Sequence, residues 1–181
     1  LLLTHVGMAT TPVLYRKLPY NYETDFEYLG MINDVPMTII GKPQLEAKNF
    51  KEMREWIGKN PGKVNLGNAG IGSASHLCGL LFQSAIKVEM QTVPYKGTGP
   101  ALTDLMGGQV DLMCDQTTNT TAQIEANTVR AYAVTTQKRL ATPALAALPT
   151  LDQSGLKGFN VTIWHGLFAP KGTPKAVTDR L

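Results

Sequence analysis

The stretch KVNLGNAGIGSASHLCGLLFQSAI, Lys63 to Ile86, contains an apolar segment, a loop rich in glycine and serine, and a helical segment. The apolar segment Lys63–Asn68 predicts a strand, and His76–Ile86 predicts an amphipathic helix. Five residues of that helix fall on one face: Leu77, Leu80, Leu81, Ser84 and Ala85. The stretch therefore predicts one strand–loop–helix unit of an α/β fold.

Two further units of the same kind follow along the chain. Their strands are predicted at 90–95 and 110–115, their loops at 96–100 and 116–120, and their helices at 101–106 and 121–126, with a last strand at 130–136. Strands that alternate with helices predict crossover connections and a mostly parallel sheet. The three loops then emerge at the carboxyl edge of one sheet, where open α/β sheets bind ligands.

The charge pattern argues against nucleic acid and fits an anionic ligand. The 181 residues carry 17 Lys and Arg against 14 Asp and Glu, a net charge of +3 without a basic stripe. No acidic residue lies between Glu55 and Glu89 or between Asp152 and Asp179. An anion site requires such surroundings, although chance placement is the alternative.

No window approaches the ~20 apolar residues of a membrane span. The first residues, LLLTHVGM, have no basic region and no small-residue cleavage site, so we do not expect a signal peptide here. They indicate the interior of a strand, in a chain whose beginning is missing. Cys78 and Cys114 have neither CxxC nor metal-ligand spacing. We expect buried free thiols and no metal site, with a disulfide as the alternative.

A nucleotide cofactor is not expected at the first glycine loop. Gly67 and Gly72 have the spacing of a phosphate-binding P-loop, but Ser73 occupies the position of the required lysine. Gly70 and Gly72 match the start of the dinucleotide fingerprint, yet Ser75 replaces its third glycine.

A serine hydrolase is also possible on paper, from Ser73 or Ser75, His76 or His165, and Asp115. The G-x-S-x-G elbow is absent. Adjacent Ser75 and His76 on one helix point about 100° apart and cannot form a nucleophile–base pair. We therefore expect no enzyme, and the hydrolase stays as a lesser alternative.

Anion binding by neutral groups explains the loops better. Glycines let backbone N–H groups approach a ligand, serine and threonine hydroxyls add donors, and each following helix offers the positive end of its dipole. The alternative is that each loop only connects a strand to a helix. Convergence of three loops on one sheet edge favours the anion site.

Four stretches, GNAGIGSASHL, VPYKGTGPALTDLMGGQVDLMCDQ, TTQKRLATPALAALPTLDQSG and GLFAPKGTP, resemble the Bug-type (TctC-like) solute-binding proteins of tripartite tricarboxylate transporters. The resemblance runs over essentially the whole chain. It implies a monomeric bacterial periplasmic receptor, without cofactor, whose two α/β lobes close on a small mono- or dicarboxylate and deliver it to membrane permease subunits. It implies a type II binding-protein fold with an incomplete first lobe, because the family's first strand and glycine loop are absent.

On that pattern, residues 1–36 and 161–181 belong to lobe 1 and residues 37–160 form lobe 2, with hinge crossings near 35–41 and 159–168. The implied ligand-binding residues of lobe 2 are Gly70, Ile71, Gly72, Ser73, Ser75, Tyr95, Lys96, Gly97, Thr98, Asp115, Gln116 and Thr117, and those of lobe 1 are Thr4, His5, Trp164 and His165. Another class of protein, the effector-sensing domain of a transcription regulator, shares this two-lobe design and would carry a DNA-binding module upstream.

Overall fold

The computed structural model describes residues 1–181 and divides them into two compact units. Unit 1 comprises Leu1–Val35 and Ile163–Leu181, and unit 2 comprises Pro36–Thr162. Each is described by itself below. Lobe movement about the hinges predicted near 35–41 and 159–168 stays a prediction.

Unit 2 is a mixed sheet with helices on both faces. Its elements are the end of β2 (Phe26–Gly41), α2 (Phe50–Lys59), β3 (Asn65–Asn68), α3 (Ala74–Ile86), β4 (Gln91–Pro94), α4 (Thr98–Met106), β5 (Leu112–Gln116), α5 (Thr117–Glu125) and β6 (Arg130–Val134). The strand order is β6-β2-β5-β3-β4. Strand β3 runs parallel to β4 and β5, whereas β2 is antiparallel to β5 and β6. Only β2 therefore opposes the other strands, and the predicted mostly parallel sheet is confirmed.

The strand–helix connections are shorter than the sequence predicts. Helix α3 begins at Ala74, where the Ser73 side chain accepts a hydrogen bond from the His76 N–H and caps the helix. Helix α4 begins at Thr98, after Gly97, whose positive φ of 109° is one that L side chains rarely adopt. Helix α5 begins at Thr117, directly after β5, so the loop predicted at 116–120 is wrong.

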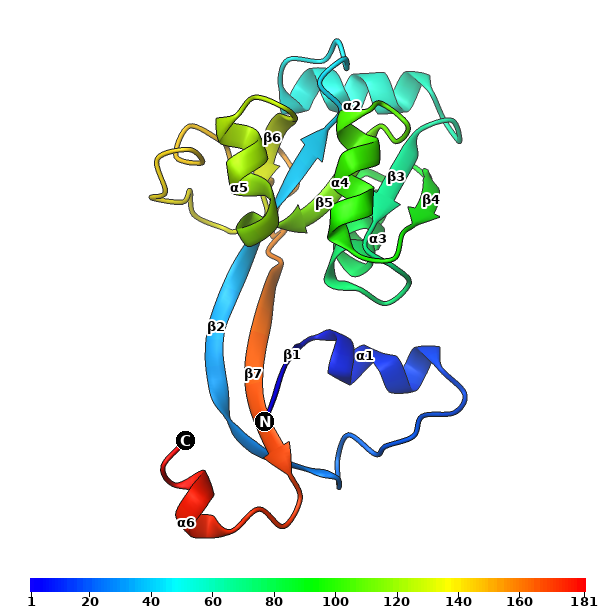
Figure 1. The fold of residues 1–181 in the computed structure, drawn as a ribbon. Coiled ribbons are helices and arrows are strands. Elements are labelled where there is room, and N and C mark those ends of the chain that lie inside the picture. The colour runs from blue at the N-terminus through cyan, green and yellow to red at the C-terminus, as the bar shows by residue number, and fades with distance from the viewer. The chain divides into compact units, whose positions relative to one another are not determined.

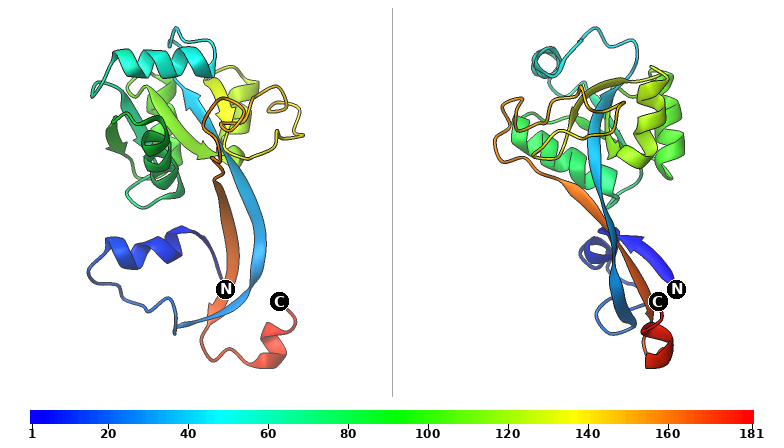
Figure 2. Two further views of the ribbon diagram at one scale, coloured as in Figure 1. Left: turned by 180° about the vertical axis from the view of Figure 1, so that it is seen from behind. Right: turned by 90° about the vertical axis from the view of Figure 1, so that its left-hand side faces the viewer.

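Helices lie on both sides of the sheet (Figures 1 and 2), and residues that alternate along the strands face one or the other side. On one face, Ile40 and Met113 pack with Leu102 and Leu105 of α4. Helix α5 covers the same face, and α3 covers the other. Helix α2 joins the α3 side through an edge-to-face contact between Phe50 and Phe82, whose rings lie 6.2 Å apart.

The buried face of α3 is not the one the leucine spacing suggests. Cys78, Gly79, Phe82 and Ile86 face the sheet, whereas Leu80 and Leu81 are exposed. Small residues bring the helix close to β3: a Cβ on Gly79 would lie only 2.8 Å from Leu66 Cδ2. Close approach selects the Cys78–Gly79 side for the interior and leaves two leucines outside.

Cys78 and Cys114 form a disulfide, so the expected free thiols are wrong. Met113 and Cys114 point to opposite faces of β5, and Cys114 faces α3. The two Cα atoms lie 6.0 Å apart, within the usual range for a disulfide. Both half-cystines are fully buried and join the first half of α3 to the middle of β5.

Unit 1 contains β1 (Leu2–His5), α1 (Gly7–Leu14), the first part of β2, β7 (Thr162–Pro170) and α6 (Lys175–Thr178). Strand β1 pairs antiparallel with β7, which also neighbours β2. The strand predicted at the start of the chain is confirmed, with Thr4 and His5 at its end. Among the helices of the chain, none has the length and apolar character needed to cross a bilayer.

Replacing both half-cystines, Cys78→Ala with Cys114→Ala, should lower the free energy of unfolding by ~3–4 kcal/mol, because the bond closes a 36-residue loop in the unfolded chain. Urea denaturation with and without dithiothreitol measures this. The double variant is the control, because reductant should leave its midpoint unchanged. An unfolding midpoint identical in wild type and double variant would contradict the prediction.

Candidate functional site

The first two strand–helix connections of unit 2 are joined by backbone hydrogen bonds. The Tyr95 N–H donates to the Asn68 carbonyl at 2.9 Å, and the Gly97 N–H donates to the Ala69 carbonyl at 3.1 Å. These bonds continue the parallel pairing of β3 and β4 beyond the strand ends. The start of α4 is thereby placed beside the loop that leads into α3.

Asp115, the penultimate residue of β5, connects the third strand–helix junction to the second. Its carboxylate accepts hydrogen bonds from the Thr98 hydroxyl at 3.1 Å, the Asn119 amide at 2.8 Å and the Gln116 N–H at 2.7 Å. Burial raises the pKa of Asp115, and these three bonds oppose that rise. The Asp115 carboxylate therefore holds α4 and α5 together at one edge of the sheet.

The loop before α3 depends on glycine conformation and on local side-chain bonds. Gly70 and Gly72 have φ of 120° and 80°, values that L side chains rarely adopt. The Asn68 side chain accepts from the Gly70 N–H at 2.9 Å. His76 Nδ1 accepts from the Gly72 N–H at 3.2 Å, and burial lowers the pKa of His76. The neutral imidazole thus acts as an acceptor within the loop.

Three helices therefore begin at one sheet edge, and each presents first-turn N–H groups without partners inside its helix. None of α3, α4 and α5 has an acidic residue in its first turn. Each helix start carries the equivalent of about half a positive charge. This edge of unit 2 is chemically suited to a small anion.

The serine geometry does not match a hydrolase. The Ser73 hydroxyl is occupied as the cap of α3, and the Ser75 hydroxyl donates to the Cys114 carbonyl at 2.6 Å. His76 Nδ1 faces the Gly72 N–H and neither serine. The nucleophile–base pair that a serine hydrolase requires is not formed by these residues.

The structure gathers the predicted unit 2 residues but gives several of them supporting roles. Ser75 and Asp115 are buried and bonded within the site, and the Tyr95 hydroxyl donates to Asp104 of α4 at 2.7 Å. Ile71 and Lys96 are exposed. The remaining predicted residues lie at the helix starts and their loops: Gly70, Gly72, Ser73, Gly97, Thr98, Gln116 and Thr117.

The predicted unit 1 residues lie on paired strands. Thr4 and His5 on β1 face Gly166 and His165 on β7 in the register. The His5 and His165 rings are 5.8 Å apart, and His5 Nδ1 accepts from the Gly7 N–H. Burial, and then the neighbouring His165, lower the pKa of His5. Trp164 lines an apolar hollow of about 340 Å³ with Tyr28, Met31, Leu167 and Phe168.

Two asparagines of the site were missed by sequence reasoning. Asn68 shapes the first loop, and Asn119 bonds Asp115 and approaches Thr98 Oγ1 at 3.5 Å. The four-residue separation of Asp115 and Asn119 at a strand–helix junction is a signal that could have indicated the second of them.

This fold is shared with solved structures that include a periplasmic binding protein. The chain resembles the periplasmic binding protein BugD with 56% identity and a TM-score of 0.91, over 98% of this chain and 59% of that one. It resembles R. palustris Rpa4515 with adipate at 32% identity and a TM-score of 0.93, over 98% of this chain and 59% of that one. It also resembles MatC (Rpa3494) from Rhodopseudomonas palustris with bound malate at 34% identity and a TM-score of 0.86, over 97% of this chain and 60% of that one.

The chain belongs to the TctC family, described as tripartite tricarboxylate transporter family receptor, whose model matches residues 1–181. The resemblance inferred from the sequence and the predicted binding-protein fold are both confirmed. The chain spans about half the length of the curated relatives it matches, 52% to 55% of three of them.

Asp115→Asn should change how stability depends on pH. Burial raises the folded-state pKa of Asp115 above its ordinary value of 3.8, so the carboxyl group contributes its full stability below that pH. This contribution is lost as the pH rises through the raised pKa. The wild-type free energy of unfolding, minus that of Asp115→Asn, should therefore fall as the pH rises above 3.8.

Urea denaturation across this range measures the difference. Asp152→Asn is the control, because the hydrogen bond from the Gly158 N–H lowers the pKa of Asp152. The free energy of unfolding of the wild type, minus that of this variant, should therefore rise with pH. The same slope for both variants would contradict the assignment of Asp115 as the buried carboxyl group with the raised pKa.

Proposed function

We propose that this chain is part of a periplasmic receptor that binds a small organic carboxylate and delivers it to a membrane transporter of the tripartite tricarboxylate type. The ligand is bound at the edge of unit 2 where α3, α4 and α5 begin. Its negative charge is met by first-turn N–H groups and by the three helix dipoles. Hydroxyl groups at the same junctions, such as that of Thr117, orient the ligand.

The convergence of three helix starts is the observation that carries this proposal. Their first turns contain no carboxylate, and Asp115, the nearest acidic side chain along the chain, already accepts three hydrogen bonds. The resemblance to proteins whose structures contain adipate and malate supports a carboxylate as the ligand. Family membership supports the transporter as the partner.

The disulfide supports the proposed compartment. Disulfides persist in oxidising surroundings such as the bacterial periplasm and are rare in the cytosol. The Cys78–Cys114 bond lies beneath the site, because Cys114 precedes Asp115 and its carbonyl accepts the Ser75 hydroxyl bond. In the oxidised chain, the disulfide therefore joins α3 to β5 directly beneath the proposed ligand site.

Malate, adipate and their neutral diamides distinguish charge recognition from shape recognition. The full-length protein should be stabilised by at least one dicarboxylate, by about 2.7 kcal/mol at 100 times its Kd, and by neither diamide. Thermal shift and titration calorimetry measure both. Equal binding of acid and diamide would refute an anion site, and no response to a broad panel of organic acids would refute the receptor.

Gly70→Ala should weaken binding of that dicarboxylate by at least about tenfold. The new Cβ would lie 3.1 Å from the Tyr95 carbonyl oxygen at a φ of 120°, so the loop must move. Gly62→Ala is the matched control, because Gly62 also has a positive φ, 69°, but open space around it. If calorimetry gives both variants the wild-type Kd, the Gly70 loop is not part of the binding site.

A further inference from the structure

Two leucines of α3 are exposed although their helix is part of the sheet packing of unit 2. Leu80 and Leu81 have 44% and 51% of their surfaces exposed, one turn after Leu77 on the same helical face. Scattered exposed leucines are ordinary, but adjacent ones beside hollows form a contiguous apolar surface. We call Leu77, Leu80, Leu81 and Ser84 the outer face of α3.

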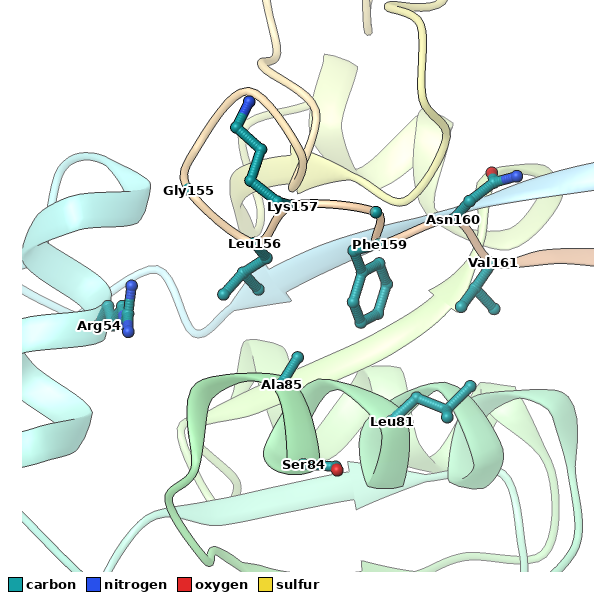
Figure 3. A pocket seen from close by; sticks show the side chains of 11 residues that line it. Arg54, Leu81, Ser84, Ala85, Gly155, Leu156, Lys157, Phe159, Asn160 and Val161 are labelled. Atoms are coloured by element: carbon teal, nitrogen blue, oxygen red, sulfur yellow. The ribbon is translucent and has the colours of Figure 1, made fainter.

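A hollow of about 480 Å³ lies on one side of this outer face. Leu81 and Ala85 point into it from α3, and Leu156, Phe159 and Val161 point toward them from the facing segment (Figure 3). Arg54 of α2 lies at one end of the hollow, whereas the Lys157 side chain points away from it. The side chains that face one another across this hollow are therefore apolar, with a cation at one end.

A second hollow, of about 560 Å³, lies on the other side. Residues of α3 and of the segment that follows it line this hollow: Leu80, Gln83, Ser84, Lys87, Val88, Glu89, Met90 and Thr92. Ser84 borders both hollows. The outer face of α3 is thus a ridge between two depressions, a shape that a protein segment can fit on both sides.

The charges around the ridge are mainly positive. The residues around the two hollows include the cations Arg54 and Lys87, one carboxylate, Glu89, and Lys157, whose side chain points away. Lys157 is paired with Asp152 at 3.5 Å, whereas Arg54 and Lys87 are in no salt bridge. A second copy of this chain would oppose cations to cations if it met this surface face to face. Charge complementarity instead favours an acidic partner.

We propose that the outer face of α3 is the docking surface for a membrane subunit of the transporter, through a segment that combines apolar side chains with carboxylates. The partner's apolar side chains fill the two hollows around Leu80 and Leu81, and its carboxylates pair with Arg54 and Lys87. This inference rests on the proposed function. Ser73, which caps the start of α3, lies in the proposed anion-binding loop. A partner docked on the outer face would therefore contact the helix that begins at the ligand.

Site-specific photocrosslinking in cells tests the surface without any ligand assumption. Benzoylphenylalanine replaces Leu81 in the full-length receptor, which is expressed with the transporter's membrane subunits, and mass spectrometry identifies the peptide joined to it. We expect a membrane-subunit peptide with apolar and acidic residues. The same replacement of Lys48, which lines a different hollow of unit 2, should give about tenfold less adduct.

Charge reversal gives a second measurement on the same cells. Arg54→Glu should reduce the Leu81-position adduct about tenfold, and Lys48→Glu should leave it unchanged. An adduct to a second receptor copy, an adduct within the receptor itself, or no adduct would each overturn the docking proposal. The Kd of each purified charge variant for the dicarboxylate is measured in parallel. If the wild-type receptor does not bind the dicarboxylate, the proposed function is refuted, whereas the docking surface is judged by the adducts alone.

Discussion

The buried carboxylate of Asp115 is the constraint on which the edge of unit 2 depends. A carboxylate removed from water is stable only when hydrogen-bond donors replace its hydration. Here the donors come from Thr98 at the start of α4, Asn119 in α5 and the Gln116 N–H at the β5–α5 junction. Satisfying one buried group therefore forces two helix starts to the same place. The backbone bonds from Tyr95 and Gly97 then add the loop of α3.

Helix α3 has two different faces, and both have consequences for function. Its inner face approaches β3 closely at Gly79 and is tied to β5 through Cys78, which leaves the helix start little freedom to move. Its outer face leaves Leu80 and Leu81 exposed. A rigid helix that begins at a ligand and presents apolar side chains to solvent can connect the proposed ligand site with the proposed partner.

The proposed recognition of an anion by neutral groups would distinguish this edge from sites that use an arginine. Backbone N–H groups and helix dipoles are held in place by the fold, so they require little reorganisation when an anion arrives. Their strength depends on geometry, which is why the glycines at 70 and 72 and the bonds accepted by Asn68 and His76 matter. Lys96, the one cation within the predicted site, is exposed and secondary in this arrangement.

The alternation of strands and helices and the glycine loops after the strands could be predicted from the sequence, because these depend on local periodicity and turn chemistry, and the family resemblance followed from four motifs. Which face of α3 is buried could be read only from the folded chain, since the close approach at Gly79 outweighs the spacing of the leucines. The folded chain also shows that Cys78 and Cys114 bond, and that Asp115 organises the site through Asn119. The disulfide and the buried face of α3 depend on distances between residues far apart in the chain and on burial, which no local pattern records, whereas the spacing of Asp115 and Asn119 is a local signal that the structure was needed to interpret.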